Sequence, residues 1–99
     1  MVGMDAITIN RPMPGADADG NVEGGFELIA NTRGTLGTPT QADIEAAGQL
    51  NTQVDQVLAL RRSTDIRDAD QVVTPRGTFE VVSVAIRRLY LRALIRKIV

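Results

Sequence analysis

The side chains of this chain that could do chemistry are carboxylates, arginines and a few hydroxyls. The sequence has no cysteine and no histidine, so neither a Ser-His-Asp nor a Cys-His catalytic site can be built. Neither serine, Ser63 nor Ser83, lies in a nucleophile-elbow motif. Carboxylate pairs such as Asp68 and Asp70 occur, but twelve acids in 99 residues make such pairs inevitable. General acid–base catalysis also needs a shaped, partly dry pocket, which nothing in the sequence indicates. We therefore expect no enzyme, no catalytic residue and no bound cofactor.

The acidic run around Asp17 and Asp19 has some features of a calcium-binding loop, because alternate oxygen ligands suit a hard cation. Its sixth position is Val22 where a calcium loop needs glycine, and its twelfth is Leu28 where a bidentate glutamate belongs. The glycines here are not followed by the Gly-Lys-Ser/Thr of a phosphate-binding loop. We expect a solvated loop over residues 12–25 and no metal site.

The C-terminal segment carries four arginines, Arg87, Arg88, Arg92 and Arg96. Arginines in such a stripe can contact phosphates. Proteins that bind single strands usually also stack bases on aromatic side chains, and this chain has only three, Phe26, Phe79 and Tyr90. The pattern favours a solvated or subunit-facing stripe, and a small nucleic-acid-binding barrel that uses these arginines is the alternative.

Charge is distributed unevenly along the chain. Residues 1–55 contain eight acidic and two basic side chains, and residues 56–99 contain four acidic and nine basic ones. One acidic and one basic surface would suit head-to-tail self-association. A monomer held by internal salt bridges explains the counts equally well.

Length and composition predict a single domain over residues 1–99. No stretch approaches the roughly 18 apolar residues of a membrane span. The first five residues lack the charged and apolar regions of a signal peptide. We expect no contact with a membrane, and a protein made in the cytoplasm.

Hydrophobic alternation and turn residues predict six or seven short strands. The expected strands cover residues 6–10, 26–30, 32–36, 52–62, 71–74 and 78–84, with a turn at Asn31 and a bulge or close approach at Gly34. One helix is expected, from about Pro39 to Ala47, with Thr38 as its cap, Gln41 completing a capping box and Gly48 as its stop.

Residues 88–99 fit two periodicities. Arg88, Arg92 and Arg96 recur every fourth residue, as on an amphipathic helix, while Leu89, Leu91, Ala93 and Ile95 alternate, as on a strand. Periodicity leaves both readings open. So many strands in so short a chain still predict a mainly β fold, a small closed or nearly closed antiparallel β-barrel with one short inserted helix, because closure removes exposed edges.

The ordered segments resemble the small phage head–tail joining proteins, also called head-closure or stopper proteins. The resemblance spans Ile7 to Val99 and lies in the succession of ITINRP, DADGN, GFELIA, RGTL, EAAGQ, QVDQVLALRR, RSTDIRDADQVV, RGTFEVVSV and RRLYLRALIRKIV. The sequence departs from the family pattern at Phe26, where tryptophan is common, and near Asp55, where histidine is frequent. It also lacks the Asp/Pro turn that usually separates the last two strands.

The resemblance implies a barrel with a helix or loop inserted between early and middle strands, and a final strand over Leu89 to Val99 that pairs with Thr78 to Val84. It also implies a structural virion role in the neck, after assembly in the host cytoplasm. The protein would form a ring of six or twelve copies under the portal or adaptor protein, close the DNA-filled head and dock the tail terminator or tail tube protein.

Packaged DNA would pass through the channel of that ring. Loop 12–25 and insertion 37–51 are the candidate contact or channel-facing segments. Their candidate residues are Asp17, Asp19, Glu23, Thr38, Gln41, Ile44 and Glu45. The candidate subunit-contact residues are Arg87, Arg88, Arg92 and Arg96.

Overall fold

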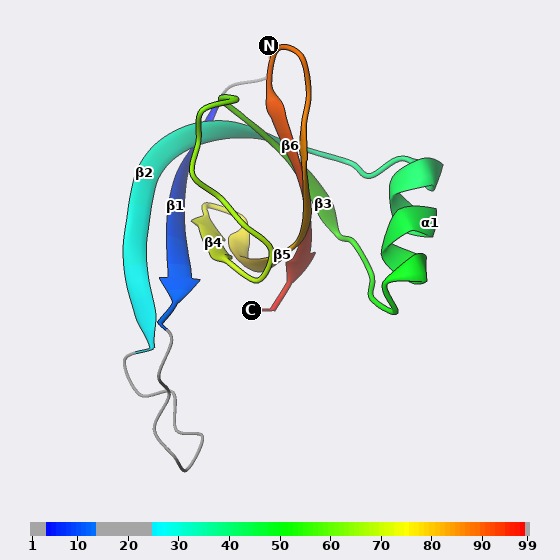
Figure 1. Cartoon of the computed structure of the whole chain (residues 1–99), viewed down its shortest axis with the longest axis horizontal. Coiled ribbons are helices and arrows are strands. Elements are labelled where there is room, and N and C mark those ends of the chain that lie inside the picture. Colours follow the sequence, from blue (N-terminus) through cyan, green and yellow to red (C-terminus); the bar gives the residue numbers. More distant parts are fainter. Residues whose placement is uncertain (1–3, 14–24, 99) are drawn as a thin grey trace.

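A computed structural model describes residues 4–13 and 25–98 of the chain. Six antiparallel strands form a closed barrel in the order β1-β2-β3-β6-β5-β4, and pairing between β4 and β1 closes it (Figure 1). The elements are β1 (Asp5–Pro12), β2 (Phe26–Gly37), α1 (Gln41–Gln49), β3 (Gln56–Leu60), β4 (Gln71–Thr74), β5 (Gly77–Ile86) and β6 (Leu91–Lys97). The predicted mainly β fold, a barrel with one short inserted helix, is confirmed.

Side chains that alternate along the strands fill the barrel. The buried core comprises Ile7, Ile9, Leu36, Leu58, Leu60, Ile66, Val72, Phe79, Val81, Leu91, Ala93 and Ile95. All but Ile66, which lies in the β3–β4 connection, come from strands. Because side chains in a strand point alternately to opposite faces, the residues between these positions lie on the outside of the barrel.

β2 is a single strand where the sequence predicted two strands and a turn. Asn31 lies in the middle of it and pairs with Thr8 of β1, so the predicted turn at Asn31 is wrong. The predicted close approach at Gly34 is confirmed. A Cβ atom on Gly34 would lie 2.7 Å from Cδ2 of Leu60 and 2.9 Å from the carbonyl oxygen of Ala59. The absent side chain therefore lets β2 curve closely over β3.

α1 begins and ends two residues later than predicted. Its cap is Thr40, where the sequence suggested Thr38: the Asp43 N–H donates to the Thr40 hydroxyl (3.2 Å) and the Thr40 N–H donates to the Asp43 carboxylate (2.7 Å). Asp43 thus takes the place in the capping box that Gln41 was predicted to fill.

Gly48 lies inside α1, so the prediction that it stops the helix is wrong. The helix ends at Gln49, and Asn51, just after the C-cap Leu50, has a φ of +54°. The Asn51 N–H donates to the Gly48 carbonyl and the Thr52 N–H to the Ala47 carbonyl, which is the hydrogen-bond pattern of a Schellman motif. Asparagine tolerates the left-handed conformation better than most residues, and so it replaces the expected glycine.

The C-terminal segment is a strand, as the family resemblance implied. β6 pairs with β3 on one side and with β5 on the other. Residues Arg87 to Tyr90 make the turn between β5 and β6, closed by a 2.8 Å hydrogen bond from the Arg87 N–H to the Tyr90 carbonyl. No residue of this turn has a positive φ, so the turn does not require glycine or asparagine. The sequence therefore carries no turn signal there.

The β3–β4 connection is fixed to the barrel by one arginine. Arg11 of β1 donates to both carboxylate oxygens of Asp70, at 3.0 Å each, and to Asp65 at 3.0 Å. Asp70 also accepts the Arg67 N–H at 2.8 Å, and its side chain is only 1% exposed. This network holds the connection over the barrel and keeps Ile66 in the core.

Candidate functional site

α1 is joined to the outside of the barrel by one ion pair. Arg92 lies on β6 between the core residues Leu91 and Ala93, so its side chain points outward. Its two terminal nitrogens donate to the two carboxylate oxygens of Asp43, each at 2.5 Å. The Asp43 side chain is 8% exposed and that of Arg92 is 20% exposed. Two parallel bonds fix the helix in orientation as well as in position.

Three buried apolar residues accompany this pair and do not belong to the barrel core. Val57 of β3 and Leu94 of β6 face each other across the outer surface of the sheet. Ala47 lies one helical turn after Asp43, on the same side of α1. We infer that α1 covers the outer faces of β3 and β6 here. β6 is therefore buried on both faces, which explains why its apolar residues do not alternate cleanly.

The ion pair shifts the titration of both partners. The Arg92 guanidinium lowers the pKa of Asp43 well below its ordinary value; burial acts in the opposite direction, and the Thr40 backbone N–H adds to the lowering. In turn, Asp43 raises the pKa of Arg92. The pair stays ionised at neutral pH.

The side of α1 away from the barrel is exposed. Thr38, Gln41, Ile44 and Glu45, four of the predicted contact residues, lie in or just before the helix and are all exposed. Ile44 is 49% exposed, and Leu50, directly after the helix, is 59% exposed. The structure thus places three of these predicted residues on α1 and the fourth, Thr38, in the connection that leads into it. Asp17, Asp19 and Glu23 lie outside the described residues.

The four predicted arginines divide into two pairs with different surroundings. Arg92 binds Asp43, and Arg96 donates to Glu80, its cross-strand partner on β5, at 2.6 Å. Arg87 and Arg88 lie exposed in the β5–β6 turn, which we call the hairpin tip (Arg87–Tyr90). Leu89 of the hairpin tip is 85% exposed and the adjoining Ile86 is 64% exposed. The predicted stripe of four arginines is therefore not one surface.

Three further arginines, which no sequence motif marks, lie at the same end of the barrel as the hairpin tip. Arg61 and Arg62 directly follow β3, whose last residue pairs with the first residue of β6, and Arg62 and Ile86 line the same shallow pocket. Arg33 lies on β2. None of these three arginines, nor Arg87 or Arg88, forms a salt bridge with another described residue. We call these five residues the arginine end: Arg33, Arg61, Arg62, Arg87 and Arg88. The sequence could have indicated this set only if the ends of the strands had been known.

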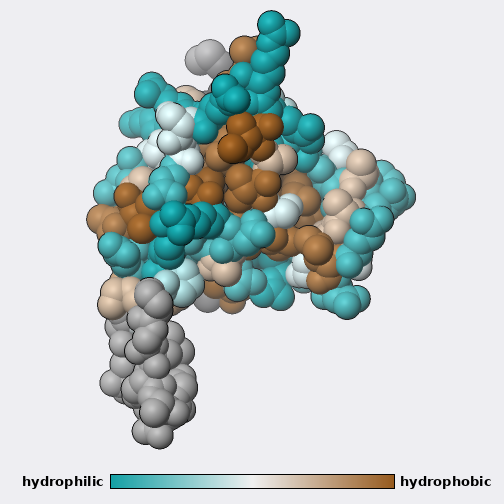
Figure 2. Space-filling view, in the orientation of Figure 1, coloured by the Kyte–Doolittle hydropathy of each residue, from teal (hydrophilic) through white to brown (hydrophobic). Residues whose placement is uncertain are grey.

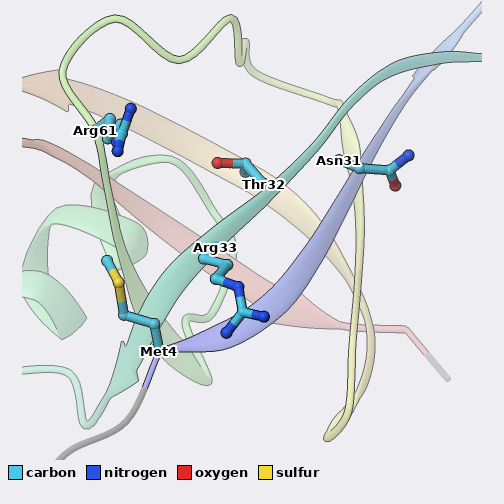
Figure 3. Close-up of a pocket in the computed structure, with 5 residues that line it drawn as sticks. All are labelled: Met4, Asn31, Thr32, Arg33 and Arg61. Atoms are coloured by element: carbon cyan, nitrogen blue, oxygen red, sulfur yellow. The ribbon is translucent and has the colours of Figure 1, made fainter.

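A cavity of about 460 Å³ at this end is lined by Met4, Asn31, Thr32, Arg33 and Arg61. Figure 3 shows that the side chains of Arg33 and Arg61 come from different segments and point in different directions. The two guanidinium groups do not converge on one point. The cavity lacks the geometry that would hold a single small anion.

A second hollow of about 430 Å³ lies where β2 leads into α1. It is lined by Thr35, Gly37, Thr38, Val57, Ala59, Tyr90 and Arg92. Figure 2 shows apolar surface on this face, from below the hairpin tip towards α1. Its lining is mostly apolar or small, which suits a packing surface better than a reacting substrate.

No family model, curated protein or solved structure matches this chain. Among residues 4–13 and 25–98 there is no group of three or more acidic side chains placed to hold a metal ion. Within the same ranges, no helix has the length and hydropathy that crossing a membrane requires.

Proposed function

We propose that this protein is a structural component of the virion at the head–tail interface. It forms a ring under the portal or adaptor protein, closes the DNA-filled head and docks the tail terminator or tail tube protein. The carrying observation is the architecture: a closed six-stranded barrel with one helix inserted between β2 and β3, which is the arrangement that the resemblance to head-closure proteins implies.

The surfaces of the barrel support a role in assembly. Four exposed apolar side chains lie outside the barrel core: Ile44 on α1, Leu50 directly after it, and Ile86 and Leu89 at the β5–β6 hairpin. Contiguous exposed apolar surface generally marks a protein–protein contact. A 99-residue barrel buries a limited core and gains stability from bound neighbours by mass action.

The test is complementation of a phage that lacks this protein. Its DNA-filled heads are expected to lose DNA and to remain without tails, and addition of the purified chain is expected to restore both DNA retention and tail joining. Electron microscopy counts joined particles, and nuclease protection measures retained DNA. Heads that keep their DNA and join tails equally well without the protein would refute the proposal.

The arginine end favours a second candidate, a nucleic-acid-binding barrel. Arg92 and Arg96 already bind carboxylates, so this function would depend on Arg61, Arg62, Arg87 and Arg88. Binding through phosphate contacts predicts an affinity for DNA that falls steeply with salt, and each arginine lost reduces the slope by about one. Fluorescence anisotropy with a short duplex at several salt concentrations decides between the two candidates.

A further inference from the structure

Two exposed surfaces of this chain have opposite charge and similar apolar content. At the hairpin tip, Arg87 and Arg88 precede Leu89, and Ile86 adjoins them. On α1, Glu45 lies beside Ile44. Both surfaces offer exposed aliphatic area; the hairpin tip adds positive charge and α1 adds negative charge. Two such surfaces are complementary in the way that protein interfaces require.

The exposed side of α1 has room for an inserted side chain. Gln41, Ile44, Glu45 and Gly48 are spaced three and four residues apart and therefore lie along one side of the helix, away from Asp43 and Ala47. A Cβ atom on Gly48 would meet nothing within 4 Å. The surface next to Ile44 is therefore open, and an aliphatic side chain from outside can approach the helix backbone there.

The two surfaces are held in a fixed relation to each other. Arg92, which binds Asp43 of α1, lies three residues after Leu89 on the same strand-and-turn segment. Figure 1 shows α1 beside the barrel and the hairpin at its end, so one copy can use both surfaces at once. A closed ring needs this arrangement, because a constant rotation between two different contact surfaces is what closes a head-to-tail assembly.

We propose that the hairpin tip of one copy docks on the exposed side of α1 of the next copy. Leu89 packs between Ile44 and Gly48, and Arg88 faces Glu45. The inference rests on the proposed function, whose ring contact it specifies. A second copy is the partner because one chain carries both complementary surfaces, in separate places.

The absence of cysteine from the sequence makes a direct test available. The variants Leu89→Cys and Ile44→Cys change exposed side chains and should leave the barrel intact, which circular dichroism verifies. A short bifunctional maleimide is added to each variant alone, to their mixture and to the double variant, both with the isolated chain and within joined virions. The mixture is expected to give a cross-linked dimer, and the double variant a ladder that ends at the ring size.

Matched controls separate this contact from others. Val73→Cys places a thiol on the exposed face of β4 and is expected to give no dimer with Leu89→Cys. In the double-cysteine background, Arg88→Glu should weaken the ladder several-fold, and the further change Glu45→Arg should restore it.

Two results would overturn the proposal: a dimer of Leu89→Cys with itself, or Leu89→Cys cross-linked to another protein in place of a second copy. So would the absence of a ladder both in the isolated chain and in virions that have joined tails. In that last case the head-closure function stands and only this contact fails. Failure of complementation by the wild-type chain refutes the function, while the isolated chain still tests the contact.

Discussion

Asp43 of α1 and Arg92 of β6 are 49 positions apart in the sequence and form a bidentate ion pair whose two bonds measure 2.5 Å each. The same carboxylate accepts the Thr40 N–H, so one side chain both caps the helix and fastens it to the barrel. Few other contacts attach α1: Ala47 is the one buried apolar residue within the helix. The position of the inserted helix therefore depends mainly on this pair.

Removing one partner of this pair should destabilise the protein. Asp43→Ala is expected to reduce the free energy of unfolding by about 2–4 kcal/mol, somewhat less than a fully buried pair because Arg92 keeps a fifth of its side chain in water. The double variant Asp43→Ala/Arg92→Ala should cost less than the sum of the two single changes. Urea denaturation of the wild type, both single variants and the double variant measures this double-mutant cycle.

In Asp43→Ala, hydrogen exchange should show that the amides of α1 exchange faster than in the wild type while those of the barrel change less. Equal acceleration throughout the protein would mean that the pair does not fasten the helix.

The same pair predicts how stability depends on pH. Since Arg92 lowers the pKa of Asp43, the unfolded chain takes up a proton at this position before the folded one does as the pH falls. Its contribution is therefore fully present above the ordinary aspartate pKa of about 4 and is lost as the pH falls below it. Between about pH 6 and about pH 3, the wild-type protein should lose stability more steeply than Asp43→Asn/Arg92→Met. Parallel curves for the two proteins would contradict this prediction.

Asp65 and Asp70 both bind Arg11 but should differ greatly in importance. The Asp70 side chain is 1% exposed and that of Asp65 is 57% exposed. Asp70→Ala leaves the Arg67 N–H without its acceptor and the Arg11 guanidinium with only the exposed Asp65, and is expected to cost about 3–5 kcal/mol. Asp65→Ala should change stability far less, because an ion pair with a solvent-exposed carboxylate contributes little. Thermal unfolding compares the two variants; equal losses would contradict the prediction.

Gly34 and Gly37 offer a matched pair on one strand. A methyl group on Gly34 would collide with Leu60, Leu58 and the Ala59 carbonyl, whereas one on Gly37 would meet nothing within 4 Å. Gly34→Ala is expected to cost about 1–3 kcal/mol through overpacking. Gly37→Ala should be neutral or stabilise by up to about 1 kcal/mol, because alanine restricts the unfolded chain. Chemical denaturation of both variants measures the difference in stability. If Gly37→Ala is destabilised as much as Gly34→Ala, crowding of the added methyl group is not the cause of the loss.

Much of the barrel was predictable from local sequence. β4 lies at its predicted residues, and β1 and β5 differ only in their ends, because β-branched runs bounded by Pro, Gly and Asn are strong local signals. The close approach at Gly34 was also predictable. Gln41, Ile44 and Glu45 of α1 and Thr38 just before it were named as contact candidates from the sequence, and the structure shows all four exposed. Their role in contacts stays a prediction.

Other features depended on residues far away in the chain. Leu91–Lys97 fits a helix and a strand equally well by periodicity; it is a strand because β3 and β5 supply its hydrogen bonds, and Leu94 is buried on its outer face as well. The separation of Arg92 and Arg96 from Arg87 and Arg88 has the same origin, since Asp43 and Glu80 reach only the first two.

Composition and local pattern by themselves determined the number and kind of most elements and excluded histidine and cysteine chemistry. Tertiary structure alone decided which arginines are exposed and which face of α1 lies against the barrel. Hydrophobic alternation and turn residues determine the structure of neighbouring residues in the sequence. Ion pairs and burial on both faces of a strand depend on segments that only the closed barrel brings together.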